Sequence, residues 1–134
     1  MRMADFMKQL NGQYGTFYRK QVKGRGYVFQ NRFKSTLIQD GTYLQMAIAY
    51  VLRNPVRAMP TIRYDRYKWS SGQYYFSPQK NPIIEIDFVN GLFGKKSQLS
   101  EIVGSKRNDE MPIINTEYGH ILGGKHFLEK ALKK

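Results

Sequence analysis

One short segment, residues 40–58, most constrains how this chain can fold, because its sequence is typical of a helix with two marked ends. Asp40 can cap the first turn with its carboxylate. Pro55 predicts the end of the helix, since the residue before a proline is pushed out of the α region. We expect a helix over about residues 40–53. Its core-facing stripe is predicted from apolar residues at helical spacing: Leu44, Ala47, Ile48, Val51 and Leu52.

Tyr50 lies on the flank of this predicted helix, about 120° from the centre of the apolar stripe at 3.6 residues per turn. It is expected to project beside the basic residues Arg53 and Arg57. A tyrosine in such a place is usually a half-buried packing residue with a hydrated hydroxyl. The pattern alone leaves both a packing role and a chemical role open.

Positive charge and aromatic side chains are concentrated in the first half of the 134-residue chain, whose net charge is +12. Residues 1–70 hold 13 lysines and arginines against 3 acidic residues, and 14 of the 19 aromatic residues lie in residues 1–75. Basic residues neutralise phosphates and aromatic faces stack on unpaired bases, so this mixture favours a nucleic-acid surface. A solvated basic face with ordinary core aromatics is the alternative. The candidate DNA-binding residues are Arg19, Lys20, Lys23, Arg25, Arg32, Lys34, Arg53 and Arg57.

The rest of the first half is predicted to contain two helices, a strand and loops. A helix over residues 2–10 should end at the Asn-Gly pair that follows it, and a strand is expected at about 34–39. A short helix is expected around residues 65–75. Tyr67, Trp69 and Tyr74 are its candidate anchors, and for Trp69 a core position is favoured over ligand binding.

Composition changes at residues 77–82, SPQKNP, which predicts a division into residues 1–76 and a helical extension, residues 77–134. The extension is predicted to hold three short helices, over residues 84–93, 95–107 and 124–132, with a loop over 108–123.

Several classes of site are not predicted. The chain has no cysteine, and the spacing of six between His120 and His126 suits neither a helical nor a strand metal pair. No phosphate-binding glycine loop and no nucleophile elbow is present. No apolar run is long enough to span a membrane and no signal-peptide pattern begins the chain, so a soluble cytoplasmic protein is expected.

Two ordered motifs resemble a known family. Residues 26–58, GYVFQNRFKSTLIQDGTYLQMAIAYVLRNPVRA, and residues 67–71, YKWSS, are similar to the second half of the insertion-sequence-200-like single-tyrosine transposases. The similarity is closest to the branch associated with repetitive extragenic palindromes and covers roughly residues 3–75. Residues 119–132 also resemble the region downstream of the domain in larger members.

The resemblance implies a reaction. Such transposases cut and rejoin single-stranded DNA beside a hairpin, and a helix-borne tyrosine becomes linked to the 5′ phosphate. Tyr50 matches the position of this nucleophile. A divalent metal, Mg²⁺ or Mn²⁺, is held by a His-hydrophobic-His pair, and Asn54 matches the position that can complete its shell. Members of the family work as dimers.

The sequence departs from the family in lacking the His-hydrophobic-His pair and most of the antiparallel sheet that carries it. We therefore expect a mainly helical α+β fold, a remnant of a ferredoxin-like domain with at most one short strand or hairpin. The lone strand would have an unpaired edge, so a homodimer is expected. The function expected is that of a DNA-binding transposase-like protein, inactive alone. A non-catalytic basic module for hairpin DNA or structured RNA is the alternative, and a helical remnant without function is a third reading.

Overall fold

The computed structural model describes residues 2–77, 81, 83–105, 111–116 and 119–133. Within these ranges the chain is mainly helical with a small sheet, so the predicted α+β class is confirmed. The chain divides into two compact units, Met1–Ser35 and Thr36–Lys134. They are called unit 1 and unit 2 below.

Unit 1 is built on one long helix, α1, which spans Met3–Val22. Lys23 ends it with a positive φ of 50°. The segment after the helix folds back along it, because a Cβ atom on Gly15 would lie 3.9 Å from Val28 and the rings of Tyr14 and Phe29 are 5.9 Å apart. The predicted break after residue 10 is wrong. The apolar spacing continues past Gly12, and one glycine inside a helix costs only about 1 kcal/mol.

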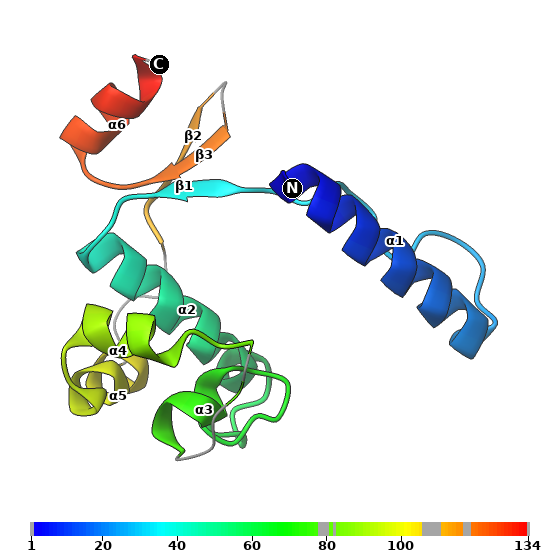
Figure 1. The fold of residues 1–134 in the computed structure, drawn as a ribbon, viewed down its shortest axis with the longest axis horizontal. Coiled ribbons are helices and arrows are strands. Elements are labelled where there is room, and N and C mark those ends of the chain that lie inside the picture. Colours follow the sequence, from blue (N-terminus) through cyan, green and yellow to red (C-terminus); the bar gives the residue numbers. More distant parts are fainter. Residues whose placement is uncertain (1, 78–80, 82, 106–110, 117–118, 134) are drawn as a thin grey trace. The chain divides into compact units, whose positions relative to one another are not determined.

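Unit 2 contains all the other elements (Figure 1). Its helices are α2 (Thr42–Ala58), α3 (Gly72–Phe76), α4 (Ile86–Phe93), α5 (Lys96–Gly104) and α6 (Lys125–Leu132). Its strands are β1 (Thr36–Ile38), β2 (Ile113–Thr116) and β3 (Gly119–Leu122).

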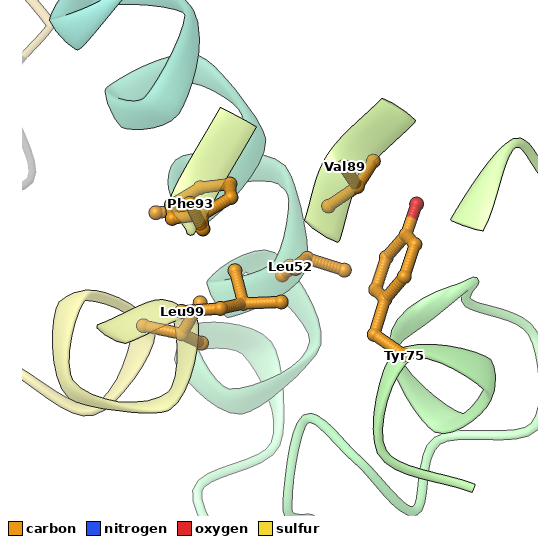
Figure 2. Close-up of a cluster of buried hydrophobic side chains, with 7 residues drawn as sticks. Leu52, Tyr75, Val89, Phe93 and Leu99 are labelled. Carbon is orange, nitrogen blue, oxygen red and sulfur yellow. The ribbon is translucent and has the colours of Figure 1, made fainter. Parts of the chain in front are cut away.

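The core of unit 2 forms where α3, α4 and α5 meet α2. Figure 2 shows Leu52 of α2 among Val89 and Phe93 of α4 and Leu99 of α5, with Tyr75 of α3 alongside. Leu52, Phe93 and Leu99 are almost completely buried. Residues on both sides of the predicted boundary at 76–77 thus share one core. Residues 78–80 and 82 of the predicted break lie outside the described residues.

Helix α2 differs from its prediction at both ends. It runs through Pro55 to Ala58, whereas the sequence predicted an end near residue 53. A proline removes one backbone hydrogen bond, but the N–H groups after it are intact, and Met59 donates to the Pro55 carbonyl at 2.9 Å. Asp40 does not cap the first turn. Its Oδ1 accepts from the Gly41 N–H at 2.7 Å, just before the helix begins.

The buried face of α2 is rotated from the predicted stripe by about a quarter turn. Leu52 is 2% exposed and Ala47 is also buried, as predicted, but Val51 is 62% exposed and Ala49 is fully buried instead. The small side chain of Ala49 allows neighbouring helices to pack closely against α2. On this face Gln45 also donates to the Leu92 carbonyl of α4 at 2.7 Å.

The sheet has the strand order β1-β3-β2. β1 pairs with β3 in parallel, Thr36 opposite His120, while β2 and β3 form an antiparallel hairpin. The expectation of at most one strand or hairpin is therefore wrong, as is the loop predicted over 108–123 where the structure describes it. The predicted strand at 34–39 is confirmed as β1. It is not a lone strand, since β3 pairs with one of its edges, but the order of the sheet leaves its other edge without a strand in the described part of the chain.

The three helices of the extension are confirmed as α4, α5 and α6, with ends that differ by one to two residues where the structure describes them. Gly94 ends α4 with a positive φ of 70°, as the sequence predicted. Residues 106–107 of the predicted second helix are outside the described ranges. Among the described helices, none combines the length and apolar character that crossing a bilayer requires.

Candidate functional site

Tyr50 lies on the side of α2 that is turned away from the buried face of Ala49 and Leu52. At 100° per residue, Tyr50, Asn54 and Arg57 follow one another along one ridge of the helix, which we call the tyrosine ridge. Tyr50 is half-buried, whereas Asn54 and Arg57 are exposed. The sequence prediction that Tyr50 projects from the flank of an anchored helix is thus confirmed.

The arginines beside Tyr50 have different surroundings. The Arg57 guanidinium lies 5.6 Å from the centroid of the Tyr50 ring, a cation–π distance. Arg53 points toward α5 instead, where its Nη1 donates to the Ser105 carbonyl at 2.9 Å. Arg57 therefore lies against the Tyr50 ring, and Arg53 stabilises the packing of α2 on α5.

The other six candidate DNA-binding residues all lie in unit 1 and all are exposed: Arg19, Lys20, Lys23, Arg25, Arg32 and Lys34. Unit 1 contains eight lysines and arginines and one acidic residue, Asp5, which forms an ion pair with Arg2 at 3.0 Å. In this unit Arg19 is also held against the helix, because its Nε donates to the Gly15 carbonyl at 3.3 Å.

Aromatic rings are interleaved with these charges in unit 1. Tyr27 is 93% exposed, and Phe17, Tyr18 and Phe29 are also open to solvent. The rings of Tyr14 and Tyr18 stack with centroids 6.1 Å apart. This combination of cations and open aromatic faces is the composition of a surface that binds single-stranded nucleic acid.

The residues that the structure describes fit a divalent metal poorly. Mg²⁺ and Mn²⁺ take several oxygen ligands, and Asn54 offers a single amide oxygen. No group of three histidine, cysteine or acidic side chains comes together in the described part of the chain. His120 is engaged elsewhere, since its Nδ1 lies 2.7 Å from the Asn115 Oδ1 across the hairpin. No reaction step through a metal is derived for this chain.

The predicted position of Trp69 is wrong. It was expected in the core but is 76% exposed, with the Lys68 Nζ 4.9 Å from its ring centroid. A signal for this was present: Trp69 follows three cations, Arg63, Arg66 and Lys68, within a proline-containing loop. Such a charged neighbourhood is poorly compatible with burial.

Comparison with protein-family models, with characterised proteins and with solved structures finds no match for this chain. Unit 1 offers cations and aromatic faces, and unit 2 offers a tyrosine hydroxyl beside an arginine.

Proposed function

We propose that this protein binds single-stranded hairpin DNA and is of the transposase type, without strand cleavage by this chain alone. The observation that carries the proposal is the composition of unit 1, where a net charge of +7 is combined with exposed aromatic rings. Charge alone would attract any polyanion, but stacking on aromatic faces requires bases that are unpaired. A hairpin with single-stranded flanks presents both phosphates and such bases.

The tyrosine ridge supports the enzymatic part of the proposal. In a complete active site, the Tyr50 hydroxyl would attack a phosphodiester, forming an O–P bond to the 5′ phosphate while the bond to the 3′ oxygen breaks. The Tyr50 proton is lost to solvent, and the 3′ oxygen leaves as a hydroxyl. Arg57 would contribute positive charge near the phosphate. The missing histidine pair is the reason for proposing that the chain is inactive alone.

The resemblance to single-tyrosine transposases also supports a proposal about the fold. The passage from β1 through a tight turn at Gly41 into α2 is what a remnant of a ferredoxin-like transposase domain would retain. We also propose a homodimer as the working form. The exposed apolar side chains in the first half of α1, Met3, Phe6 and Leu10, support it, since a second copy would cover them.

The test of DNA binding is fluorescence anisotropy with a labelled DNA hairpin and a duplex of equal length, titrated with salt. We expect the hairpin to be preferred at physiological salt. The double variant Arg25→Glu/Arg32→Glu should weaken hairpin binding by at least about tenfold, because each lost phosphate contact reduces affinity and the salt slope. The matched control is Lys125→Glu/Lys130→Glu, which makes the same charge change in α6.

Tyr50→Phe should leave hairpin binding unchanged, since the ring and its contact with Arg57 are kept. Equal binding of hairpin and duplex that disappears at modest salt would contradict the proposal and leave only a charged surface. An RNA hairpin of the same sequence tests the second candidate, a non-catalytic module for structured RNA, which the same basic composition supports. Light scattering at the working concentration tests the dimer.

A further inference from the structure

The loop between α2 and α3 forms a pocket. Its lining contains no residue of the tyrosine ridge and none of unit 1. Its volume is about 640 Å³, within the range of small-molecule sites. All the residues that line it belong to unit 2 and to the segment between the end of α2 and the start of α3. Figure 1 shows the course of this loop. The residues that line it are Met59, Thr61, Ile62, Arg63, Arg66, Tyr67, Lys68 and Trp69.

The loop is held in shape by hydrogen bonds although it contains no helix or strand. Backbone bonds close three successive turns, from Ile62 to Met59, from Arg66 to Arg63 and from Ser70 to Tyr67, at 2.9–3.2 Å. Tyr64 ties the loop to α5 through a 3.0 Å hydrogen bond between its hydroxyl and that of Ser100, and its ring packs edge-on against Phe76 at 5.6 Å. The pocket is therefore preformed.

The chemistry of the lining is divided between flat apolar surface and positive charge. Met59 and Ile62 supply aliphatic surface, and Trp69 supplies a large ring that is mostly open to solvent. Among the three cations of the lining, Arg63 is paired with Asp65 at 2.6 Å, and the charge of Arg66 also acts on that carboxylate. Three cations around one carboxylate leave the pocket with a net positive charge. A ligand that matches this pocket has one planar apolar face and an anionic group.

We propose that this pocket binds one unpaired nucleotide of a DNA strand, with its base stacked on Trp69 and its phosphate met by Arg66 and Lys68. Every base has a π-face, so stacking requires no particular sequence, and the cations match the phosphate. The proposal rests on the proposed DNA binding but assigns a separate site to it, in unit 2. An acidic peptide matches the charge but lacks the flat ring, and it is therefore an outcome for the test to exclude.

The experiment uses the full chain, whose single tryptophan is Trp69, so that fluorescence quenching reports this site directly. The probes are a twelve-nucleotide oligo(dT) and an abasic strand with the same number of phosphates, compared with heparin and polyglutamate. We expect oligo(dT) to quench Trp69 and to bind at least about fivefold more tightly than the abasic strand. Heparin and polyglutamate should cause little quenching.

Variants separate stacking from charge. Trp69→Ala should reduce the preference for oligo(dT), measured by anisotropy of labelled strands, and Trp69→Phe should reduce it less. The rings of unit 1 account for the preference that remains. Arg66→Ala and Lys68→Ala should lower the affinity for both strands and reduce the salt slope. The matched control is Phe88→Ala, which removes another exposed ring, on α4 and outside the pocket.

The experiment distinguishes failure of the pocket assignment from failure of the DNA-binding proposal. If hairpin DNA binds but oligo(dT) does not quench Trp69, and Trp69→Ala leaves the affinity for oligo(dT) unchanged, the pocket assignment is wrong and the DNA-binding proposal is unaffected. Quenching by heparin or polyglutamate equal to that by oligo(dT) also overturns the assignment. If no nucleic acid binds at all, both proposals fail.

Discussion

Two neighbouring residues of α2, Val51 and Leu52, should respond very differently to the same truncation. Leu52 is 2% exposed at the centre of the core, and Val51 is 62% exposed. Leu52→Ala would leave a cavity between α2, α4 and α5, so we expect a loss of about 2–5 kcal/mol in the free energy of unfolding. Urea denaturation followed by circular dichroism measures it.

Val51→Ala is the control and should change stability by less than about 0.5 kcal/mol. A large loss in the free energy of unfolding with Val51→Ala would instead show that the Val51 side chain lies in the core, as its spacing in the sequence predicted. Periodicity identifies the apolar residues of a helix, but it does not decide which of them the neighbouring helices cover. The position of Ala49 shows why, since a small residue that carries little hydropathy signal became the centre of the contact.

Two glycines of unit 2 give a second contrast at the residue scale. A Cβ atom on Gly72 would lie 2.5 Å from the Tyr64 carbonyl oxygen, which is backbone and cannot move freely. Gly72→Ala should therefore lower the midpoint of thermal unfolding, at a cost of more than about 1 kcal/mol. Gly91→Ala, in α4 with nothing within 4 Å of the added methyl, should be neutral or stabilise by up to about 1 kcal/mol. Equal effects would contradict the packing at Tyr64.

The Arg63–Asp65 pair makes the pocket loop sensitive to acid. The hydrogen bond from Arg63 holds the pKa of the Asp65 carboxyl below its ordinary value of 3.8. Because the pKa is lower in the folded state, the stabilisation is fully present above pH 3.8 and is lost as pH falls through the folded-state value. Asp65→Asn should thus be less stable than the wild type near neutral pH, with a difference that shrinks in acid.

Thermal unfolding between pH 3 and pH 7, followed by Trp69 fluorescence, measures this difference. A gap between wild type and Asp65→Asn that stays constant over the whole range would show that the carboxylate charge contributes nothing. Asp5→Asn in unit 1 serves as the control, because Asp5 also has an arginine partner but lies in the other compact unit.

At the scale of elements, substitutions at Gly12 test whether α1 is continuous through this residue. Gly12→Pro removes a helical hydrogen bond and should cost about 3 kcal/mol, breaking the helix between its two halves. Far-ultraviolet circular dichroism should show a clear loss of helical signal. Gly12→Ala should raise it slightly, because a Cβ atom there meets nothing within 4 Å. No change with Gly12→Pro would mean that the helix already ends near residue 10.

The elements that the sequence predicted well are those with a strong local signal. Helix α4 has apolar residues at regular spacing and a glycine after it, and its end at Gly94 was predicted correctly. The hairpin of β2 and β3 was missed because each strand has only four residues, and because β3 gains its second partner, β1, from a distant part of the chain. The exposure of Trp69 depends on a loop geometry that periodicity does not encode, and only the three cations before it in the sequence indicated it. The flank position of Tyr50, in contrast, follows from helical spacing.

At the scale of the whole molecule, the division at Ser35 predicts that unit 2 folds without unit 1. A fragment of residues 36–134 contains every residue of the core around Leu52 and all three strands. It should unfold cooperatively in urea, and Leu52→Ala should destabilise the fragment as much as the full chain. Gradual, non-cooperative unfolding of the fragment would show that unit 1 is needed for the core. The fragment should also lose most of the hairpin affinity.

The parallel pairing of β1 with β3 has a consequence for the order in which the protein forms during synthesis. Gln39, directly after β1, accepts a hydrogen bond from the backbone N–H of Gly124, 85 residues later in the chain. The helical core is complete once residue 103 has left the ribosome, but β1 has no strand to join until residues 120–122 have emerged. The helices can therefore fold on the ribosome before the sheet, which is the later step.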